Sequence, residues 1–299
     1  MEKKTIILLL ITFLMLFGCK VKPQDNKDVK EVQNLENVYP EEVEEAPADT
    51  VKANKSPKIK ISSYQYTWSK NDNLPPMLIV IDDFGDAAGE LLQDFANLPP
   101  EIAFAILPDL PQTETTAKLA KKNGHEVLIH VPMQPEGKAN PGRRYIKKGM
   151  KASDIKELIA DFHRQIPNAI AANNHMGSAV TADYATISAV MEKLNDEGLI
   201  FLDSATTPKS AVPSAANNLG MKTLNRDLVL DVPDISDATI ISKIQGLAKF
   251  KGRNEPIIII THCHNRAKLE GLQKFISQVT DMGIKLIPLS KAYRSAPPA

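Results

Sequence analysis

Two hydrophobic patterns alternate along the chain from residue 77 onward. Short, nearly continuous apolar runs have the length and character of strands buried on both faces, and the stretches between them repeat apolar residues every three to four positions, as amphipathic helices do. The runs predict eight strands, at residues 78–81, 102–107, 126–131, 169–174, 199–203, 223–230, 257–261 and 285–289. Helices are predicted between them, among others at residues 112–123, 152–165, 183–196, 235–250 and 266–282.

Strands that alternate with helices, with no sign of hairpins, predict an α/β fold with a parallel sheet. Seven or eight such units favour a barrel closed by βα repeats, and the alternative is an open doubly wound sheet. No glycine-rich phosphate loop follows any predicted strand, so we expect no nucleotide ligand. The predicted domain spans residues 74–292 and is followed by a short tail, residues 293–299.

The first nineteen residues have the composition of a secretion signal rather than of a folded segment. Lys3 and Lys4 precede an apolar stretch at residues 5–17 that is short for crossing a bilayer, and Cys19 follows Gly18. The end of this stretch is similar to the lipobox of bacterial lipoprotein signals, which implies cleavage before Cys19 and attachment of lipid there. The alternative is an uncleaved membrane anchor. Both place the rest of the chain outside the cytoplasm and tied to a membrane, as in a lipoprotein of the cell envelope.

Residues 20–73 are predicted to be a disordered tether. They are polar and rich in charge, as in EEVEEAPAD at residues 41–49, and they contain too little apolar surface to offset the entropy of ordering. A flexible chain of this length reaches on the order of 40 Å, enough to hold a domain away from a membrane surface. Within it, residues 59–68 alternate weakly between apolar and polar positions and are a candidate edge strand.

Composition removes several classes of function. The chain carries 36 basic and 36 acidic residues, so it lacks the basic excess expected of a nucleic-acid-binding protein. Aromatic residues make up 5%, which argues against a long stacking groove for glycans. Cys263 is the only cysteine besides Cys19, so once Cys19 is lipidated no disulfide within the chain is possible.

Polar residues collect at the carboxyl ends of the predicted strands, where βα barrels carry their chemistry. Four of the six histidines lie there, whereas His125 precedes a strand and His163 lies on a predicted helix. The residues at these ends include Asp82, Asp83, Asp109, His130, Asn174, His175, Asp203, Ser204, Arg226, Asp231, His262 and His264. This clustering predicts a functional site at one end of the barrel.

Carboxylates beside imidazoles form the ligand set of a catalytic divalent metal, most simply zinc. One carboxylate of the pair Asp82 and Asp83 can bind the ion while the other stays free as a base, and the ion would offset the repulsion between them. His262, which lies nearer its strand than His264, is a candidate proton donor. Two other interpretations stay open. The aspartates can cap a following helix, and Cys263 can be a nucleophile, although that leaves the aspartates without a role.

Five short motifs, in order along the chain, resemble a known family. The run IDDFG at residues 81–85 resembles the first motif of the carbohydrate esterase superfamily of polysaccharide deacetylases, and GHEVLIH at residues 124–130 resembles a motif whose last histidine binds metal. With HEVLIHVPM, NNHMGS, FLDS and a late strand that ends in histidine, the pattern is most similar to the divergent polysaccharide deacetylase family. The resemblance covers roughly residues 75–292 and implies a distorted (β/α) barrel of about seven parallel strands.

Carried over by position, the resemblance implies a metal site and two proton-transfer residues. Asp83 and His130 match metal ligands. Asp82 matches the general base, and His262 matches the general acid. The implied cofactor is therefore a divalent metal, with zinc the first choice.

The superfamily places a second metal-binding histidine four residues after the first, and this chain has Gln134 there. We therefore expect the third ligand from another strand, at His175 in the NNHMGS stretch. Five further polar residues of the strand ends are candidates for binding substrate or orienting ligands, namely Asp109, Asn174, Asp203, Ser204 and Arg226.

The function expected from these residues is metal-dependent hydrolysis of an N-acetyl (amide) group on an envelope saccharide. An ester substrate would use the same residues, and the sequence does not separate the two. The alternative from another class is a non-catalytic envelope protein that uses the barrel to bind a saccharide or a partner, an interpretation motivated by Gln134. An enzyme would depend on Asp82 and His262, whereas a binding protein would depend only on an intact surface.

Overall fold

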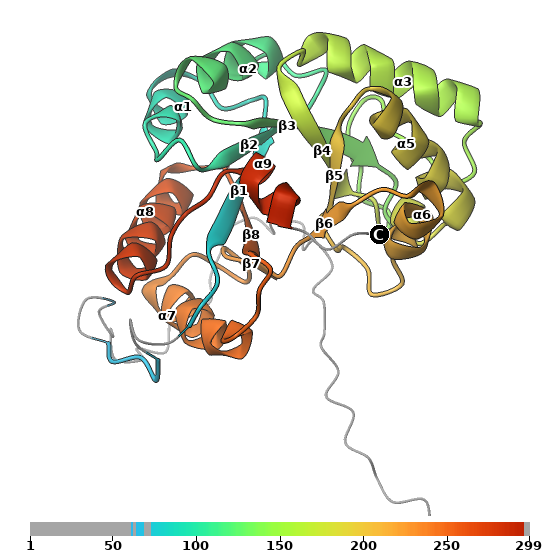
Figure 1. Cartoon of the computed structure of the whole chain (residues 1–299). Coiled ribbons are helices and arrows are strands. Elements are labelled where there is room, and N and C mark those ends of the chain that lie inside the picture. The colour runs from blue at the N-terminus through green and yellow to red at the C-terminus, as the bar shows by residue number, and fades with distance from the viewer. Residues whose placement is uncertain (1–60, 62–63, 69–72, 296–299) are drawn as a thin grey trace, which may run out of the picture. The chain divides into compact units, whose positions relative to one another are not determined.

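The computed structural model of the chain describes residue 61, residues 64–68 and residues 73–295 (Figure 1). The predicted signal peptide with its lipidation site at Cys19, most of the predicted tether and the end of the predicted tail lie outside the described residues. Among the described helices, none combines the length and the apolar character that crossing a membrane requires.

One parallel sheet of eight strands forms the centre of the described domain, in the order β6-β5-β4-β3-β2-β1-β8-β7. The strands are β1 (Met77–Phe84), β2 (Ala103–Ile106), β3 (Val127–Met133), β4 (Ala169–Met176), β5 (Ile200–Asp203), β6 (Thr223–Asn225), β7 (Leu228–Val229) and β8 (Ile257–His262). β6 and β7 follow each other in the chain but lie at opposite edges of the sheet. The sheet is therefore a curled half-barrel of parallel strands (Figure 1).

Helices follow the strands, as the alternating pattern predicts, except between β6 and β7. They are α1 (Gly89–Ala96), α2 (Thr113–Lys122), α3 (Ala152–Gln165), α4 (Ser178–Thr181), α5 (Tyr184–Asp196), α6 (Val212–Leu219), α7 (Asp237–Gly246), the 3-10 helix η2 (Leu247–Phe250), α8 (Arg266–Asp281) and α9 (Leu289–Ser295). Side chains cap three of them at the N-terminus, because Asp183, Ser236 and Asn265 each accept a hydrogen bond from a backbone N–H of the first turn.

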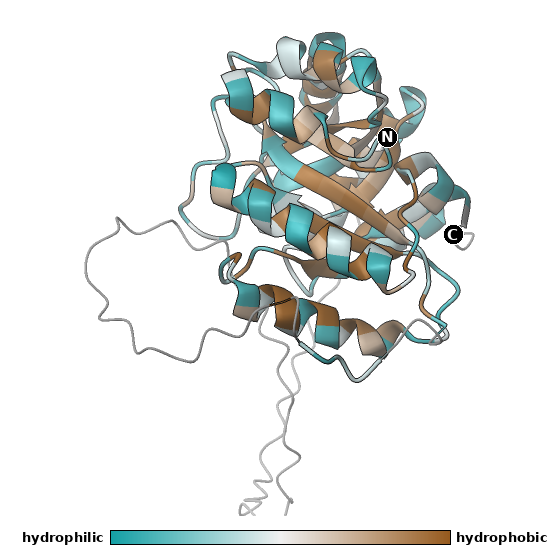
Figure 2. Cartoon of the chain, turned by 90° about the vertical axis from the view of Figure 1, so that its left-hand side faces the viewer, coloured by the Kyte–Doolittle hydropathy of each residue, from teal (hydrophilic) through white to brown (hydrophobic). Residues whose placement is uncertain are grey.

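The two faces of the sheet are covered differently, which decides between the barrel and the doubly wound alternative. The outer face packs against all the long helices in one large apolar cluster, which includes Ile79, Phe95 and Leu272. The inner face forms a smaller cluster, rich in alanine, and among the described helices only α9 contributes to it, through Leu289 and Ala292. Figure 2 shows apolar strands beneath helices that turn polar residues outward. Helices on one face and a filled interior on the other are the arrangement of a barrel.

Two predicted strands differ from the structure. Residues 285–289 form only an isolated bridge between Met77 and Leu286, because Pro288 has no N–H to continue a ladder and α9 begins at the next residue. Residues 223–230 divide into β6 and β7, because the N–H of Arg226 donates to Asp203 on one edge of the sheet and that of Asp227 donates to Ile258 near the other. Two residues thus carry the chain across the open seam of the half-barrel.

Residues 61 and 64–68, which precede the first strand, pack onto the domain, although they form no strand. Ile61 and Trp68 are buried in the outer apolar cluster, and the indole N–H of Trp68 donates to the carbonyl of Ile244 on α7 at 2.8 Å. The packed part of the chain therefore begins upstream of residue 74, the start predicted from composition. Charge dominates the composition of residues 20–73 as a whole, whereas the weak alternation at residues 59–68 marks the part that packs.

Candidate metal centre

A distortion of β1 brings two adjacent carboxylates to one place. Successive residues of a regular strand point to opposite faces, so Asp82, which follows the inward pair Leu78 and Val80, should point inward and Asp83 outward. Instead the register with β2 shifts between Ile81 and Phe84, and Asp83 has a left-handed backbone with φ of 66°. Aspartate tolerates this conformation better than most residues do. The bulge therefore lets both side chains approach the same centre.

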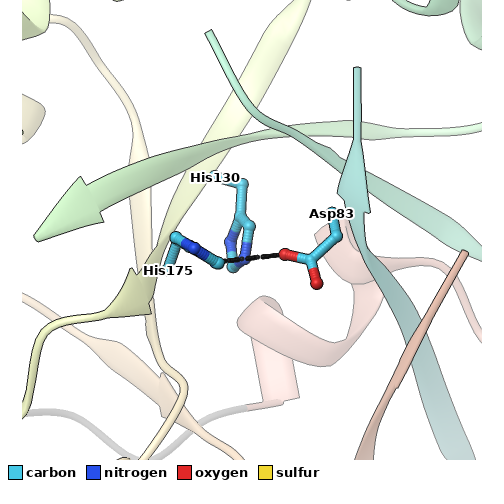
Figure 3. A group of neighbouring side chains, drawn as sticks. All are labelled: Asp83, His130 and His175. Atoms are coloured by element: carbon cyan, nitrogen blue, oxygen red, sulfur yellow. Dashed lines mark hydrogen bonds and ion pairs between the residues drawn. The ribbon is translucent and has the colours of Figure 1, made fainter. Parts of the chain in front are cut away.

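Three ligand atoms from three strands form a nearly equilateral triangle at this centre (Figure 3). Asp83 Oδ1 lies 3.1 Å from His130 Nε2 and 3.1 Å from His175 Nδ1, and the two nitrogens are 3.2 Å apart. A tetrahedral zinc ion with ligand distances of about 2.0–2.1 Å separates its ligands by about 3.3–3.4 Å. Asp83 Oδ1 is buried and, among the described residues, has no hydrogen-bond partner of good geometry. The donor set and its spacing therefore fit a divalent ion.

Asn173 fixes the orientation of His130. Its amide oxygen lies 2.8 Å from His130 Nδ1, and its amide nitrogen donates to Asp82 Oδ1 at 2.9 Å. Because an amide oxygen only accepts, Nδ1 of His130 carries a hydrogen and donates it to Asn173, and Nε2 is the nitrogen that faces the centre. His130 and Asn173 are register partners on β3 and β4, which explains why the two side chains meet.

The loop after β4 places His175. Met176 and Gly177 both have positive φ, 52° and 92°, and a Cβ added to Gly177 would lie 2.9 Å from the Cβ of Met133. Asn174 braces this loop, since its amide donates to the carbonyl of Met176 at 2.6 Å and its oxygen accepts from the backbone N–H of Ser204 at 2.9 Å. Asn174 and Ser204 therefore hold the loop that carries His175, and the amide of Asn174 is engaged by this loop.

A histidine–aspartate pair lies beside the three-residue cluster. His262 is the register partner of Asp82 on the neighbouring strand, and its Nδ1 lies 3.0 and 3.1 Å from the two carboxylate oxygens of Asp231. Burial opposes the charge on both groups, but their mutual attraction outweighs it. It lowers the pKa of Asp231 to about 2 and raises the pKa of His262 to about 9. The side chain of Asp231 is fully buried, so it holds the imidazole in one orientation.

The electrostatic balance of the centre favours positive charge. Burial raises the pKa of Asp82. Burial also opposes ionisation of Asp83, but the neighbouring imidazoles of His130, His175 and His264 outweigh it and hold the pKa of that carboxyl well below its usual range. Burial likewise opposes a charge on His130, yet the neighbouring carboxylates raise its pKa to about 9. The carboxylates that stabilise a charged His130 would also attract a metal cation placed between these side chains.

Three other predicted residues have partners of their own. Asp109 accepts hydrogen bonds from Arg144 at 2.7 and 2.5 Å. Asp203 accepts from Ser210 at 2.6 Å, and burial raises its pKa. Arg226 donates to the carbonyls of Ser204 and Ala205. Among the described residues, only Asp83, His130 and His175 form a cluster with the spacing of metal ligands. These contacts therefore make Asp203 and Arg226 braces of the loop after β5.

Four residues of the site had no role in the sequence-based prediction. Asn173 orients His130, and Asp231 orients His262. His264 contacts the outer oxygen of Asp83, and Lys268 contacts His264 and Asp231. Asp231 and His264 were visible as polar residues at strand ends. Lys268 follows in the first turn of α8, where nothing in the sequence marks it.

The curled α/β half-barrel, with an Asp–His–His cluster at the carboxyl ends of its strands, defines a deacetylase-like protein. The family model described as divergent polysaccharide deacetylase matches residues 79–293, and the chain belongs to this family.

Known relatives extend this picture. The chain is 35% identical over 188 residues to the uncharacterized protein YibQ of Escherichia coli K12, a match that covers 63% of this chain and 58% of that protein. A second uncharacterized protein, from Haemophilus influenzae Rd, is 35% identical over 170 residues, which is 57% of this chain and 58% of its own. The match thus spans little more than half the length of these relatives.

A solved structure supports the fold. The chain is similar to the uncharacterized protein ATU2773 from Agrobacterium tumefaciens C58, with a TM-score of 0.65 and 23% sequence identity. The similarity covers 77% of this chain and 94% of that one.

Proposed function

We propose that this protein is a metal-dependent hydrolase that removes N-acetyl groups from a saccharide of the cell envelope, with zinc as the ion. The observation that carries the proposal is the triangle of Asp83 Oδ1, His130 Nε2 and His175 Nδ1, whose edges measure 3.1, 3.1 and 3.2 Å. Three protein ligands leave a coordination position for water or substrate, which distinguishes a catalytic zinc site from a structural one. Membership of a deacetylase family supports the choice of reaction.

Asp82 is the residue assigned to remove a proton from the attacking water. When bound, a divalent ion polarises an amide carbonyl and makes water a stronger acid. Asp82 is 3% exposed, and burial raises its pKa, so it is a stronger base than an ordinary aspartate. Asn173 holds one of its oxygens at 2.9 Å, which fixes the direction of the carboxylate.

His262 is the residue assigned to protonate the departing nitrogen. Amide hydrolysis needs such a donor because an amine leaves only once its nitrogen is protonated. Asp231 engages Nδ1 of His262, and the pKa of about 9 keeps the ring protonated at neutral pH, so Nε2 carries a hydrogen to donate. Asp82 and His262 are register partners on β1 and β8, so the proton acceptor and the proton donor stand on neighbouring strands.

The first test measures zinc in the purified full-length chain after dialysis against zinc. We expect close to one ion per chain, lost in Asp83→Ala, His130→Ala and His175→Ala. His163→Ala is the matched control, because His163 pairs with Glu197 at 2.8 Å through contacts outside the cluster. A parent chain that retains no zinc would overturn the proposal.

The second test separates an enzyme from a binding protein. Asp82→Asn and His262→Asn should keep zinc, while acetate release from N-acetylated envelope saccharides falls by about 100-fold or more. Release from O-acetylated saccharides, measured alongside, separates amide from ester hydrolysis. A parent chain that binds zinc and a saccharide but releases no acetate supports the non-catalytic alternative.

We extend the proposal to location: lipid on Cys19 ties the protein to a membrane outside the cytoplasm. The support is the charged, apolar and small-residue pattern that ends at Cys19. Mass spectrometry of the mature N-terminus tests it directly. Cys19→Ala should release the protein from the membrane fraction, and an unchanged distribution would contradict the proposal.

A further inference from the structure

We propose that His264 and Lys268 are positioning residues that link the metal-binding carboxylate of Asp83 to the proton-donating pair of His262 and Asp231. The inference rests on the proposed function, since it concerns how that site is held in place. It assigns a role to two side chains that neither the predicted ligand set nor the proposed proton transfers use.

His264 determines which oxygen of Asp83 faces the metal centre. Its Nε2 lies 2.6 Å from Asp83 Oδ2, and its Nδ1 lies 3.0 Å from the ammonium group of Lys268. An ammonium group donates hydrogen bonds and cannot accept them, so Nδ1 of His264 must be the accepting nitrogen. Its Nε2 therefore carries the ring hydrogen and donates to Oδ2. Oδ1 is left to face the other two ligands.

Lys268 makes a second contact, on the other side of the site. Its ammonium group lies 3.1 Å from Asp231 Oδ2, the same carboxylate that holds His262 at 3.0 and 3.1 Å. The ammonium group of Lys268 thus contacts both His264, which holds Asp83, and Asp231, which holds His262. The rings of His262 and His264 also stack, with centroids 5.3 Å apart.

The start of α8 holds Lys268 in place. Its backbone N–H donates to the capping side chain of Asn265 at 3.0 Å, and its own side chain is only 16% exposed. A cation with few alternative positions can act as a fixed support rather than as a mobile surface charge. The loop from β8 into α8 therefore carries one continuous chain of contacts, from Asp83 through His264 and Lys268 to Asp231.

Loss of this support should weaken zinc binding without removing any ligand. In Lys268→Met the ring of His264 loses its partner at Nδ1 and is held only through its Nε2–H bond to Asp83, so it fixes that carboxylate less firmly. Groups that orient a metal ligand typically change metal affinity by about 10-fold to 100-fold. We expect an effect of that size in Lys268→Met and in His264→Phe. In His264→Gln the amide N–H can still reach Oδ2, so affinity should stay within about threefold of the parent.

The experiment is a competition titration of the full-length chain with zinc against a chromophoric chelator. Lys274→Met is the matched control, because Lys274 lies on the same helix and pairs with Asp237 at 2.8 Å through contacts outside the site. The double variant Lys268→Met/His264→Phe should bind zinc no more weakly than His264→Phe alone, because both residues act through one contact to Asp83.

The outcomes separate this inference from the proposed function. A parent chain that binds no zinc defeats the proposed function. If the parent binds zinc and Lys268→Met binds it as tightly as Lys274→Met does, only the positioning role of His264 and Lys268 is overturned. The nitrogen NMR shifts of the imidazoles are a second measurement, because they report the ring tautomers and would not change if Lys268 only supported the fold. The parent should show the Nε2–H tautomer of His264, with the His262 signals shifted in Lys268→Met. An Nδ1–H tautomer of His264 in the parent also overturns the link.

Discussion

Replacing Asn173 with alanine tests how the site is oriented. The change removes the acceptor for His130 Nδ1 at 2.8 Å and the donor to Asp82 Oδ1 at 2.9 Å. Asn173 is fully buried, and His130 and Asp82 are 2% and 3% exposed, so water does not readily replace either contact. Each group left unpaired costs about 1–3 kcal/mol. We expect the free energy of unfolding of the metal-free protein to fall by about 2–6 kcal/mol.

The effect on metal binding is separable from this loss of stability. Without Asn173 the ring hydrogen of His130 is free to move to Nε2, the nitrogen that faces Asp83. Loss of such an orienting partner typically weakens metal binding by about 10-fold to 100-fold, or about 1.4–2.7 kcal/mol. Asn173→Asp keeps an acceptor for the His130 N–H, so its zinc affinity should remain within a few-fold of the parent.

The assay is competition for zinc with a chromophoric chelator, together with chemical unfolding of the metal-free protein. Asn168→Ala is the matched control, because the amide of Asn168 donates to the carbonyl of Ala117 at 3.0 Å and contacts no residue of the site. Equal zinc affinity in Asn173→Ala and Asn168→Ala would refute the reasoning, since it would mean that the amide does not set the imidazole.

Three further predictions concern the surrounding fold. Gly177→Ala forces a Cβ to 2.9 Å from that of Met133 at a positive φ and should cost about 2–5 kcal/mol in urea unfolding, whereas Gly198→Ala, at φ of 71° in open space, should cost about 1–2 kcal/mol. Equal losses would exclude the clash. Asp231 has its pKa lowered to about 2 from about 3.9 in the unfolded chain, so it stabilises the fold above about pH 4 and that stability is lost as the pH falls toward 2. The advantage of the parent over Asp231→Asn in unfolding free energy should therefore shrink by about 2–3 kcal/mol across that interval, and a constant difference would contradict the pKa. Trp68 is the only tryptophan of the chain and is 5% exposed, so acrylamide should scarcely quench its fluorescence, and strong quenching would show that the segment is not docked.

Much of the fold can be predicted because a parallel sheet covered on both faces leaves long apolar runs in the sequence. β1, β3, β4 and β8 all contain such runs, and each was predicted within a few residues of its observed bounds. Residues 285–289 have the same apolar character, but Pro288 lacks the N–H that a ladder needs. Residues 223–230 are predicted as one strand. The chain passes from one sheet edge to the other at Arg226 and Asp227, and this change depends on contacts with distant strands that the local sequence does not reveal.

The site could be predicted in part for a related reason. Asp83, His130 and His175 follow three apolar runs, and the carboxyl ends of parallel strands meet at one edge of the sheet, where the structure brings their ligand atoms together. The sequence does not show which of Asn173 and Asn174 contacts His130, because both belong to the same polar run. The register of β4 against β3 decides between them, since it sets Asn173 opposite His130.

The position of β1 in the sheet has a consequence for how the chain is made. β1 lies between β2 and β8, and it carries Asp82 and Asp83, yet β8 begins only at Ile257. On the ribosome, the strands that supply Asp83, His130 and His175 emerge well before β8 does. Until then β1 exposes an unpaired edge, which is a template for association with other chains. The strand on which the centre depends is therefore covered on its second side late in synthesis, and the interval before β8 emerges is the one in which the nascent chain most needs protection from aggregation.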